Sequence, residues 1–342
     1  MTLLTALAGD AETEALLGDE AQLDAMLAVE KALADASADV GWIGTAAAAA
    51  IGAAIAGFVP DRAGLAAGMA QNGVVVPALL RQLRATIAPP HRDALHRGAT
   101  SQDIVDTALM LQLRRVLDLH EARLDRLLDR LGRLAATDGG RPLLGHTRMQ
   151  VAVPTTWGAK LASWSDPLSR GLGSIRAMRP TLLVVQLGGP VGDRGSFAGY
   201  GDAIAARLAA RLGLGTASPW QATRDPIVGL GNVLALLSGT LGKLGADVGL
   251  LAQNEIAAVR LTGGGTSSAM AHKSNPVNAE VLVALARFNA GLAGTLHQAM
   301  VHENERSGAA WTLEWLVLPL MLVTTGAGLS RAVALLDQLQ LA

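Results

Sequence analysis

The residue types best suited to chemistry lie close together in one glycine-rich segment, residues 263–276. Three consecutive glycines are followed by hydroxyl, ammonium and amide side chains, among them Ser267, Ser268, Lys273 and Asn275. Glycine lets a backbone hinge, and these polar groups can close over a bound anion. The chain uses four lysines against 24 arginines, so a lysine among small polar residues indicates a point charge placed for function. A plain flexible linker is the alternative, but it would need neither Lys273 nor Asn275.

A second polar segment, residues 96–103, carries His96, Thr100 and Ser101 directly before a long apolar pattern. The free N–H groups of a helix N-terminus bind carboxylates, and an imidazole transfers protons near neutral pH. Thr100, Ser101 and Asp103 could equally serve only as a helix cap with an acidic first turn. The residues alone leave both interpretations open.

A third polar segment, residues 145–150, contains Thr147, Arg148 and Gln150 before another predicted helix. A loop of this composition is as often a solvated connector as a binding site, so taken alone it indicates little. Further along the chain, Arg224 is followed by Asp225, and these adjacent charges favour a surface ion pair over a ligand clamp.

Long apolar helices separate these segments. Leucines recur at helical spacing from residue 104 to residue 137, where Asp138-Gly139-Gly140 predicts a stop. Other long helices are predicted over residues 157–178, 227–262, 277–302 and 309–339, and shorter ones over 18–36, up to Pro60, and over 71–85. Long helices in antiparallel array form a bundle. We therefore predict an all-α fold with a small helical N-terminal domain, residues 1–103, and a central long-helix bundle, residues 104–342.

Composition narrows the possible functions. Half of the 342 residues are hydrophobic but only 3% are aromatic, which favours helices over strands. The formal net charge is -1 and the charges are scattered, so no basic surface is expected for nucleic acid or anionic lipid. The absence of cysteine excludes disulfides, thiol nucleophiles and thiolate metal sites.

Two further features bear on location. The first 30 residues lack the basic-then-apolar order of an export signal, which predicts a cytoplasmic protein. The apolar stretch 315–330 is shorter than the roughly 20 residues that a membrane span needs, and Pro319 interrupts it. We therefore expect a buried core helix there and no membrane partner.

The predicted helix 227–262 is unusual in its glycines, each of which costs about 0.5 to 1 kcal/mol relative to alanine. They are Gly229, Gly231, Gly239, Gly242, Gly245 and Gly249. Close approach of neighbouring helices is the usual compensation, and a helix that is apolar on most faces needs partners all round. We infer burial at a subunit interface; complete burial within one chain is the alternative.

The three polar segments, in this order, resemble the motifs of the fumarase/aspartase superfamily over nearly the whole chain. Residues 266–276 are similar to the family signature G-S-S-x-M-P-x-K-x-N-P, with Ser267 at the position of the serine that acts as catalytic base. The resemblance implies a catalytic role for Lys273 and substrate contacts from Ser268, Lys273 and Asn275. The signature is not fully matched, because Thr266 replaces a glycine, Ala271 the proline and Ser274 a basic residue. Family members also usually add a small C-terminal domain after the bundle, where this chain ends.

The other two segments complete the resemblance. His96 falls where related lyases hold a catalytic or carboxylate-binding histidine, and Thr100 with Ser101 falls on a substrate contact. Thr147 and Gln150 match the second motif, in which Arg148 stands where most of these lyases carry a histidine. An arginine there implies that a substrate carboxylate is bound.

Within the superfamily, residues 71–73, 186–189, 219–225 and 302–311 look most like the bacterial carboxymuconate cycloisomerases. This likeness makes Arg224 a substrate-binding residue instead of a surface ion pair. The implied reaction is closure of 3-carboxy-cis,cis-muconate, a small tricarboxylate, to 4-carboxymuconolactone, with no metal or organic cofactor. The implied assembly is a homotetramer with shared active sites.

Two alternatives stay open. One is adenylosuccinate lyase or another lyase of the superfamily that eliminates fumarate. The other is an inactive helical scaffold, against which the intact set of Ser267, Lys273, Asn275 and His96 argues.

Overall fold

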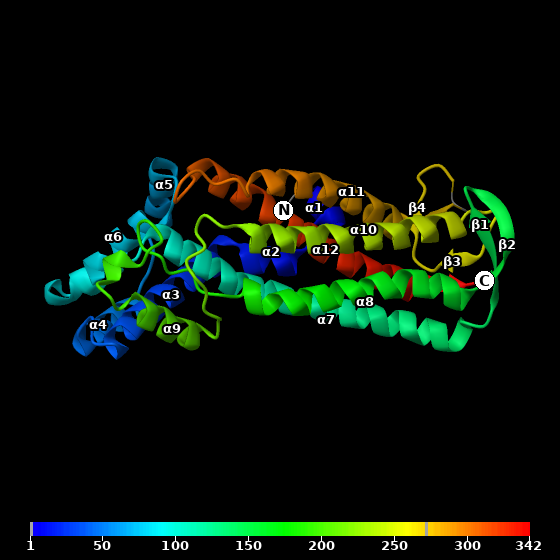
Figure 1. The fold of residues 1–342 in the computed structure, drawn as a ribbon. Helices are drawn as coiled ribbons and strands as arrows, with labels where there is room; N and C mark the ends of the chain where they lie inside the picture. The colour runs from blue at the N-terminus through cyan, green and yellow to red at the C-terminus, as the bar shows by residue number, and fades with distance from the viewer. Residues whose placement is uncertain (1–2, 271–272) are drawn as a thin grey trace.

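The structure, a computed structural model, describes residues 3–270 and 273–342, and its largest part is a bundle of five long helices lying side by side (Figure 1). These helices are α7 Ser101–Asp138, α8 Trp157–Leu182, α10 Asp225–Leu251, α11 Val277–Gln298 and α12 Gly308–Gln338. With 38 residues at 1.5 Å rise, α7 is about 57 Å long and spans the bundle from end to end. The predicted mostly helical fold is confirmed.

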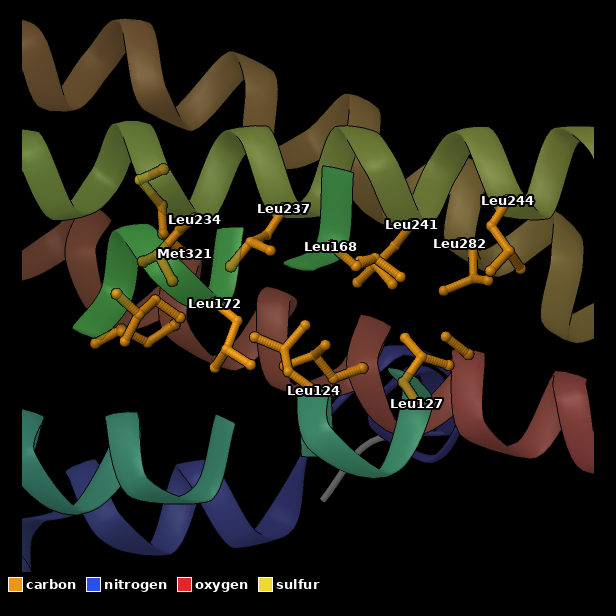
Figure 2. Close-up of a cluster of buried hydrophobic side chains, with 14 of the residues drawn as sticks. Leu124, Leu127, Leu168, Leu172, Leu234, Leu237, Leu241, Leu244, Leu282 and Met321 are labelled. Carbon is orange, nitrogen blue, oxygen red and sulfur yellow. The ribbon is translucent and has the colours of Figure 1, made fainter. Parts of the chain in front are cut away.

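Leucines from all five long helices form the bundle core. Leu124 of α7, Leu168 of α8, Leu237 of α10 and Met321 of α12 point toward one another in Figure 2 and are buried. Burying one such side chain contributes roughly 1.5 to 3 kcal/mol, so the leucine spacing that predicted the helices is also what holds them together.

Shorter helices form a head at one end of the bundle (Figure 1). They are α3 Asp19–Asp39, α4 Thr45–Ala56, α5 Arg62–Asn72, α6 Val76–Thr86, the 3-10 helix Pro89–Ala94 and α9 Gly201–Leu212. The helix predicted to start at residue 71 starts at Val76 as α6, because Gly73 ends the preceding helix α5 in a left-handed conformation with φ 68°. Two further helices, α1 Leu3–Ala8 and α2 Ala11–Leu17, lie against the bundle. The head core includes Phe197 and Ile204, from beyond residue 103.

Short strands gather at the opposite end, which we call the far end (Figure 1). The antiparallel pairs are β1 Pro142–Thr147 with β2 Gln150–Thr156, β3 Val259–Leu261 with β6 Leu339–Leu341, and β4 Gly265–Thr266 with β5 Ser274–Asn275. The pairing of β3 with β6 explains why the helix predicted over residues 227–262 is too long. Helix α10 ends at Leu251 and not at residue 262, because Val259–Leu261 is extended and hydrogen-bonds a strand near the end of the chain.

The glycines of α10 fall into two groups. A Cβ at Gly231, Gly242 or Gly245 would meet an atom of α11 at 2.3 to 2.5 Å, so these three allow close packing within the chain. Gly229, Gly239 and Gly249 face open space in this chain. The first three glycines agree with the alternative that α10 is buried within one chain. The other three stay available for the predicted subunit interface.

Three helices, α10, α11 and α12, are long and apolar enough to cross a membrane by length and composition alone. The expectation that the apolar stretch at 315–330 is too short is therefore wrong, because α12 extends over 31 residues. The expected buried core helix is nevertheless found. The three helices pack against one another, and more than half of the most apolar window is buried in α10 and in α12. In α11 only 28% of that window is buried, and Phe288 is half exposed.

Candidate active site

At the N-terminus of α7 the first polar segment meets the loop between α11 and α12. Thr100 and Asp103 form a reciprocal capping box, so the helix-cap interpretation is confirmed, while substrate contact stays a prediction. Arg306, from the loop, donates from Nε to Gln102 Oε1 over 2.9 Å and from Nη1 to Thr100 Oγ1 over 3.2 Å. Its Nη2 donates to Pro190 O at 3.2 Å and to Gly189 O at 3.5 Å, so the half-buried guanidinium is anchored within the chain. One Nη1 N–H is left without a partner among the described residues and could bind a carboxylate.

Asp103 ties this helix end to the segment 186–189. Its buried carboxylate accepts hydrogen bonds from Gly188 N at 2.8 Å, Gly189 N at 3.0 Å and Gln186 Nε2 at 3.1 Å. Burial raises the pKa of Asp103, although these N–H groups act in the opposite direction. The loop is thereby held in one place beside Thr100.

His96 and Ser101 lie on either side of the cap. His96 Nδ1 is 2.6 Å from Glu30 Oε1, and its backbone is left-handed with φ 60°. Ser101 is the half-buried first residue of α7, and among the described residues no hydrogen-bond partner reaches its hydroxyl. Both side chains keep polar groups available for a ligand.

Arg224 requires a correction, because it is neither an exposed partner of Asp225 nor free to clamp a ligand. Its fully buried guanidinium donates to Asp106 from Nη1 at 2.6 Å and to Glu314 from Nε at 2.9 Å. Burial alone would lower the pKa of Arg224, but these two carboxylates raise it. The same burial raises the pKa of Glu314. We therefore reassign Arg224 from substrate binding to holding α7 and α12 together.

The same network reaches the cap. Asp106 also accepts from Gln102 Nε2 at 3.0 Å, and Gln102 in turn accepts from Arg306. His302, in the neighbouring loop, has both ring nitrogens buried with no hydrogen-bond partner among the described residues. Burial lowers the pKa of His302, and the charge of Arg224 lowers it further. A neutral imidazole thus lies near the positively charged helix end.

At the far end, the segment 145–150 is a β-hairpin where a loop was predicted. Thr147 pairs with Gln150, and the two residues between them are left-handed, Arg148 with φ 49° and Met149 with φ 63°. Two consecutive positive φ angles are the geometry of a tight two-residue hairpin turn. The side chains of Thr147, Arg148 and Gln150 are exposed at this tip.

The segment 263–276 lies at the same end. Ser267 is half-buried, and its Oγ accepts from the backbone N–H of Ala269 at 3.3 Å and of Met270 at 3.1 Å. Such donors stabilise a hydroxyl that loses its proton. Ser268 is exposed, and residues 271–272, which include one of the signature departures, lie outside the described residues.

Lys273 and Asn275 line an open cleft of about 1020 Å³ together with Arg260 and Met270. Ser267 is not among the residues that line it. The Lys273 side chain is exposed, and Asn275 pairs with Gly265 through the backbone in the β4–β5 ladder. Glu255 lines the same cleft, so its lining carries charges of both signs.

The predicted site residues thus form two groups within one chain. His96, Thr100 and Ser101 lie at the head end of α7, whereas the hairpin and the segment 263–276 lie at the far end, about 57 Å away along that helix (Figure 1). A single chain does not bring both groups to one small substrate.

Known proteins are similar to this chain in sequence and in architecture. The family described as Lyase matches residues 10–288. The 3-carboxy-cis,cis-muconate cycloisomerase of Pseudomonas aeruginosa is 41% identical over 96% of this chain and 73% of that protein. The chain belongs to this lyase family, within the fumarase/aspartase superfamily.

Other members of the lyase family are similar as well. Nitrosuccinate lyase of Streptomyces davaonensis is 39% identical over 98% of the chain and 74% of that protein. The crystal structure of the 3-carboxy-cis,cis-muconate lactonizing enzyme from Pseudomonas putida superimposes with a TM-score of 0.93 and 37% identity, covering 99% of this chain and 77% of that one. Enzymes of the superfamily are typically homotetramers with active sites shared between chains.

Sequence reasoning missed several residues of the head end. Arg306 and His302 belong to the segment 302–311 that carried the resemblance. Their polar side chains directly before a predicted helix could have indicated site residues. No local sequence signal marks Glu30, Asp106 or Glu314, because their hydrogen-bond partners lie 66 to 118 residues away along the chain.

Proposed function

We propose that the protein closes 3-carboxy-cis,cis-muconate to 4-carboxymuconolactone. The observation that carries this proposal is the similarity to a cycloisomerase along nearly the whole chain, both in sequence and in structure. The substrate has three carboxylates, and cationic side chains occur at both ends of the bundle, Arg306 at one and Arg148 and Lys273 at the other. A cytoplasmic homotetramer would bring such ends together.

In the proposed reaction, one substrate carboxylate oxygen adds to a carbon of the double bond. Negative charge then develops on the adjacent carbon and spreads into its carboxylate, where Thr100, Ser101 and Arg306 can donate hydrogen bonds. Ser267 gives its proton to that carbon and takes another from solvent. The Ala269 and Met270 N–H groups and the Lys273 charge stabilise the serine alkoxide meanwhile.

Another lyase activity is the second candidate, favoured by the similarity to nitrosuccinate lyase, which is almost as strong. Such an enzyme would use Ser267 in the opposite sense, as the base that removes a proton from a succinate-type substrate. The adenylosuccinate alternative belongs to the same class.

One assay separates these candidates. Consumption of 3-carboxymuconate is followed in the ultraviolet beside parallel reactions with nitrosuccinate and adenylosuccinate, in which fumarate formation is measured. Turnover of 3-carboxymuconate alone is expected. Fumarate formation without lactone would replace the cycloisomerase by the lyase, and no turnover of any substrate would favour the inactive scaffold.

A further inference from the structure

We propose that Glu30, which no sequence motif marks, positions the His96 imidazole for reaction. This inference rests on the proposed function, because that function places His96 in the active site. Glu30 belongs to α3 of the head and His96 to the segment before α7, so the pair joins two parts of the chain 66 residues apart.

The environment of Glu30 is unusual for a carboxylate. The residue is 1% exposed and lies in α3 between the buried side chains of Val29 and Leu33. Its Oε1 is 2.6 Å from His96 Nδ1, and its Oε2 is buried with no hydrogen-bond partner among the described residues. A carboxylate buried among apolar groups needs a partner, and here the imidazole is the only one that the described residues supply.

The backbone turns the imidazole toward this carboxylate. His96 has φ 60° and Gly98 has φ 77°, and a Cβ at Gly98 would lie 2.6 Å from the Trp42 ring. The Gly98 carbonyl accepts a hydrogen bond from Ser196, and Arg97 stacks over Trp42 at 4.8 Å. A left-handed histidine is uncommon and persists only where its surroundings fix it, which these contacts do.

The chemistry that follows is a fixed tautomer and a fixed ring orientation. An ionised carboxylate only accepts hydrogen bonds, so Nδ1 must carry the proton that it donates to Glu30. Nε2 has no hydrogen-bond partner among the described residues and is the ring nitrogen left to meet the substrate. Glu30 does not touch the substrate itself and acts through His96.

The test combines a spectroscopic and a kinetic measurement on the full-length enzyme. Nitrogen-15 NMR of histidine-labelled protein, with the His96 signals identified by their loss in His96→Gln, should show one Nδ1–H tautomer. Glu30→Gln can donate as well as accept, so both tautomers should then appear. The kcat of Glu30→Gln should fall at least about tenfold with KM little changed, because the carboxylate no longer fixes the tautomer of the imidazole.

Two controls separate positioning from general damage. Asp35→Asn, five residues further along α3, removes a carboxylate paired with the exposed side chains of Lys31 and Arg211 and should change neither measurement. The double variant Glu30→Gln/His96→Gln should be no less active than His96→Gln alone, because Glu30 acts only through that ring.

An Nε2–H tautomer in the unaltered enzyme would overturn the proposal, and that result needs no variant to fold. Additive losses in the double variant would also overturn it, since they would show a purely structural role. If the enzyme failed to turn over 3-carboxymuconate, the proposed function would fail, whereas the NMR result would still decide how His96 is held.

Discussion

Asp103 and Arg224, at the head end of the bundle, are buried and bonded to several groups each. Arg148 and Lys273, at the far end, are exposed and have no side-chain partner among the described residues. Buried groups that are already bonded do not touch a ligand, but they hold the neighbouring residues Thr100, Ser101 and Arg306 in place, so little reorganisation is needed when a ligand arrives. The exposed groups find their partners only when substrate or another chain is present. The proposed site thus combines a preformed half with a half completed by assembly.

The largest effect is expected at Ser267. Because Ser267 is proposed to transfer the proton, Ser267→Ala should lower kcat by several orders of magnitude while the melting temperature stays unchanged. Ser268→Ala, at the exposed neighbouring position, is the matched control and should lose far less. Equal losses in the two variants, or near-normal turnover in Ser267→Ala, would refute the assignment.

Mixing inactive variants tests whether the two ends meet between chains. Ser267→Ala and His96→Ala are each expected to be inactive, but after joint unfolding and reassembly about a quarter of the sites should contain both intact groups. The control is a mixture of Ser267→Ala with Lys273→Ala, which should stay inactive because one loop supplies both residues. If light scattering showed that the protein is a monomer, the prediction that active sites are shared between chains would be wrong.

The sequence predicted the bundle well because leucine spacing and capping residues act locally. The long helix was predicted from residue 104 and begins at Ser101, because the Thr100–Asp103 cap, which the residues alone left open, is present. The Gly139-Gly140 pair marked its end. Long-range pairing could not be predicted in this way. The surface interpretation of Arg224 was wrong because its two partners, Asp106 and Glu314, lie on other helices. The catalytic roles assigned by resemblance, including that of Ser267, stay predictions.

Stability should also distinguish the two ends. Asp106→Asn leaves Arg224 buried with only one anionic partner, which should lower the free energy of unfolding by about 3 to 5 kcal/mol. Lys273→Ala removes an exposed side chain and should change it by less than about 0.5 kcal/mol. Urea unfolding at one protein concentration measures both. Similar losses would mean that the far end is held as firmly as the head end.

The smallest effect is expected for Arg148, at the tip of the β1–β2 hairpin. Most lyases of the superfamily carry a histidine there, which helps poor leaving groups such as amines or hydroxide to depart by supplying a proton. A carboxylate needs no such help, since its conjugate acid has a pKa of about 4. Arginine does not give up its proton at neutral pH, but its planar fork binds a carboxylate at two points.

Arg148→Leu should therefore raise KM for 3-carboxymuconate at least about tenfold, as expected for a charged hydrogen bond of about 1.5 to 3 kcal/mol. Met149→Leu, at the adjacent exposed position of the same turn, is the matched control and should leave KM unchanged. Arg148→His should give no fumarase or adenylosuccinate lyase activity, because the rest of the site is unaltered. An unchanged KM in Arg148→Leu would show that the hairpin tip does not reach the substrate, and the far end would then contribute only through the segment 263–276.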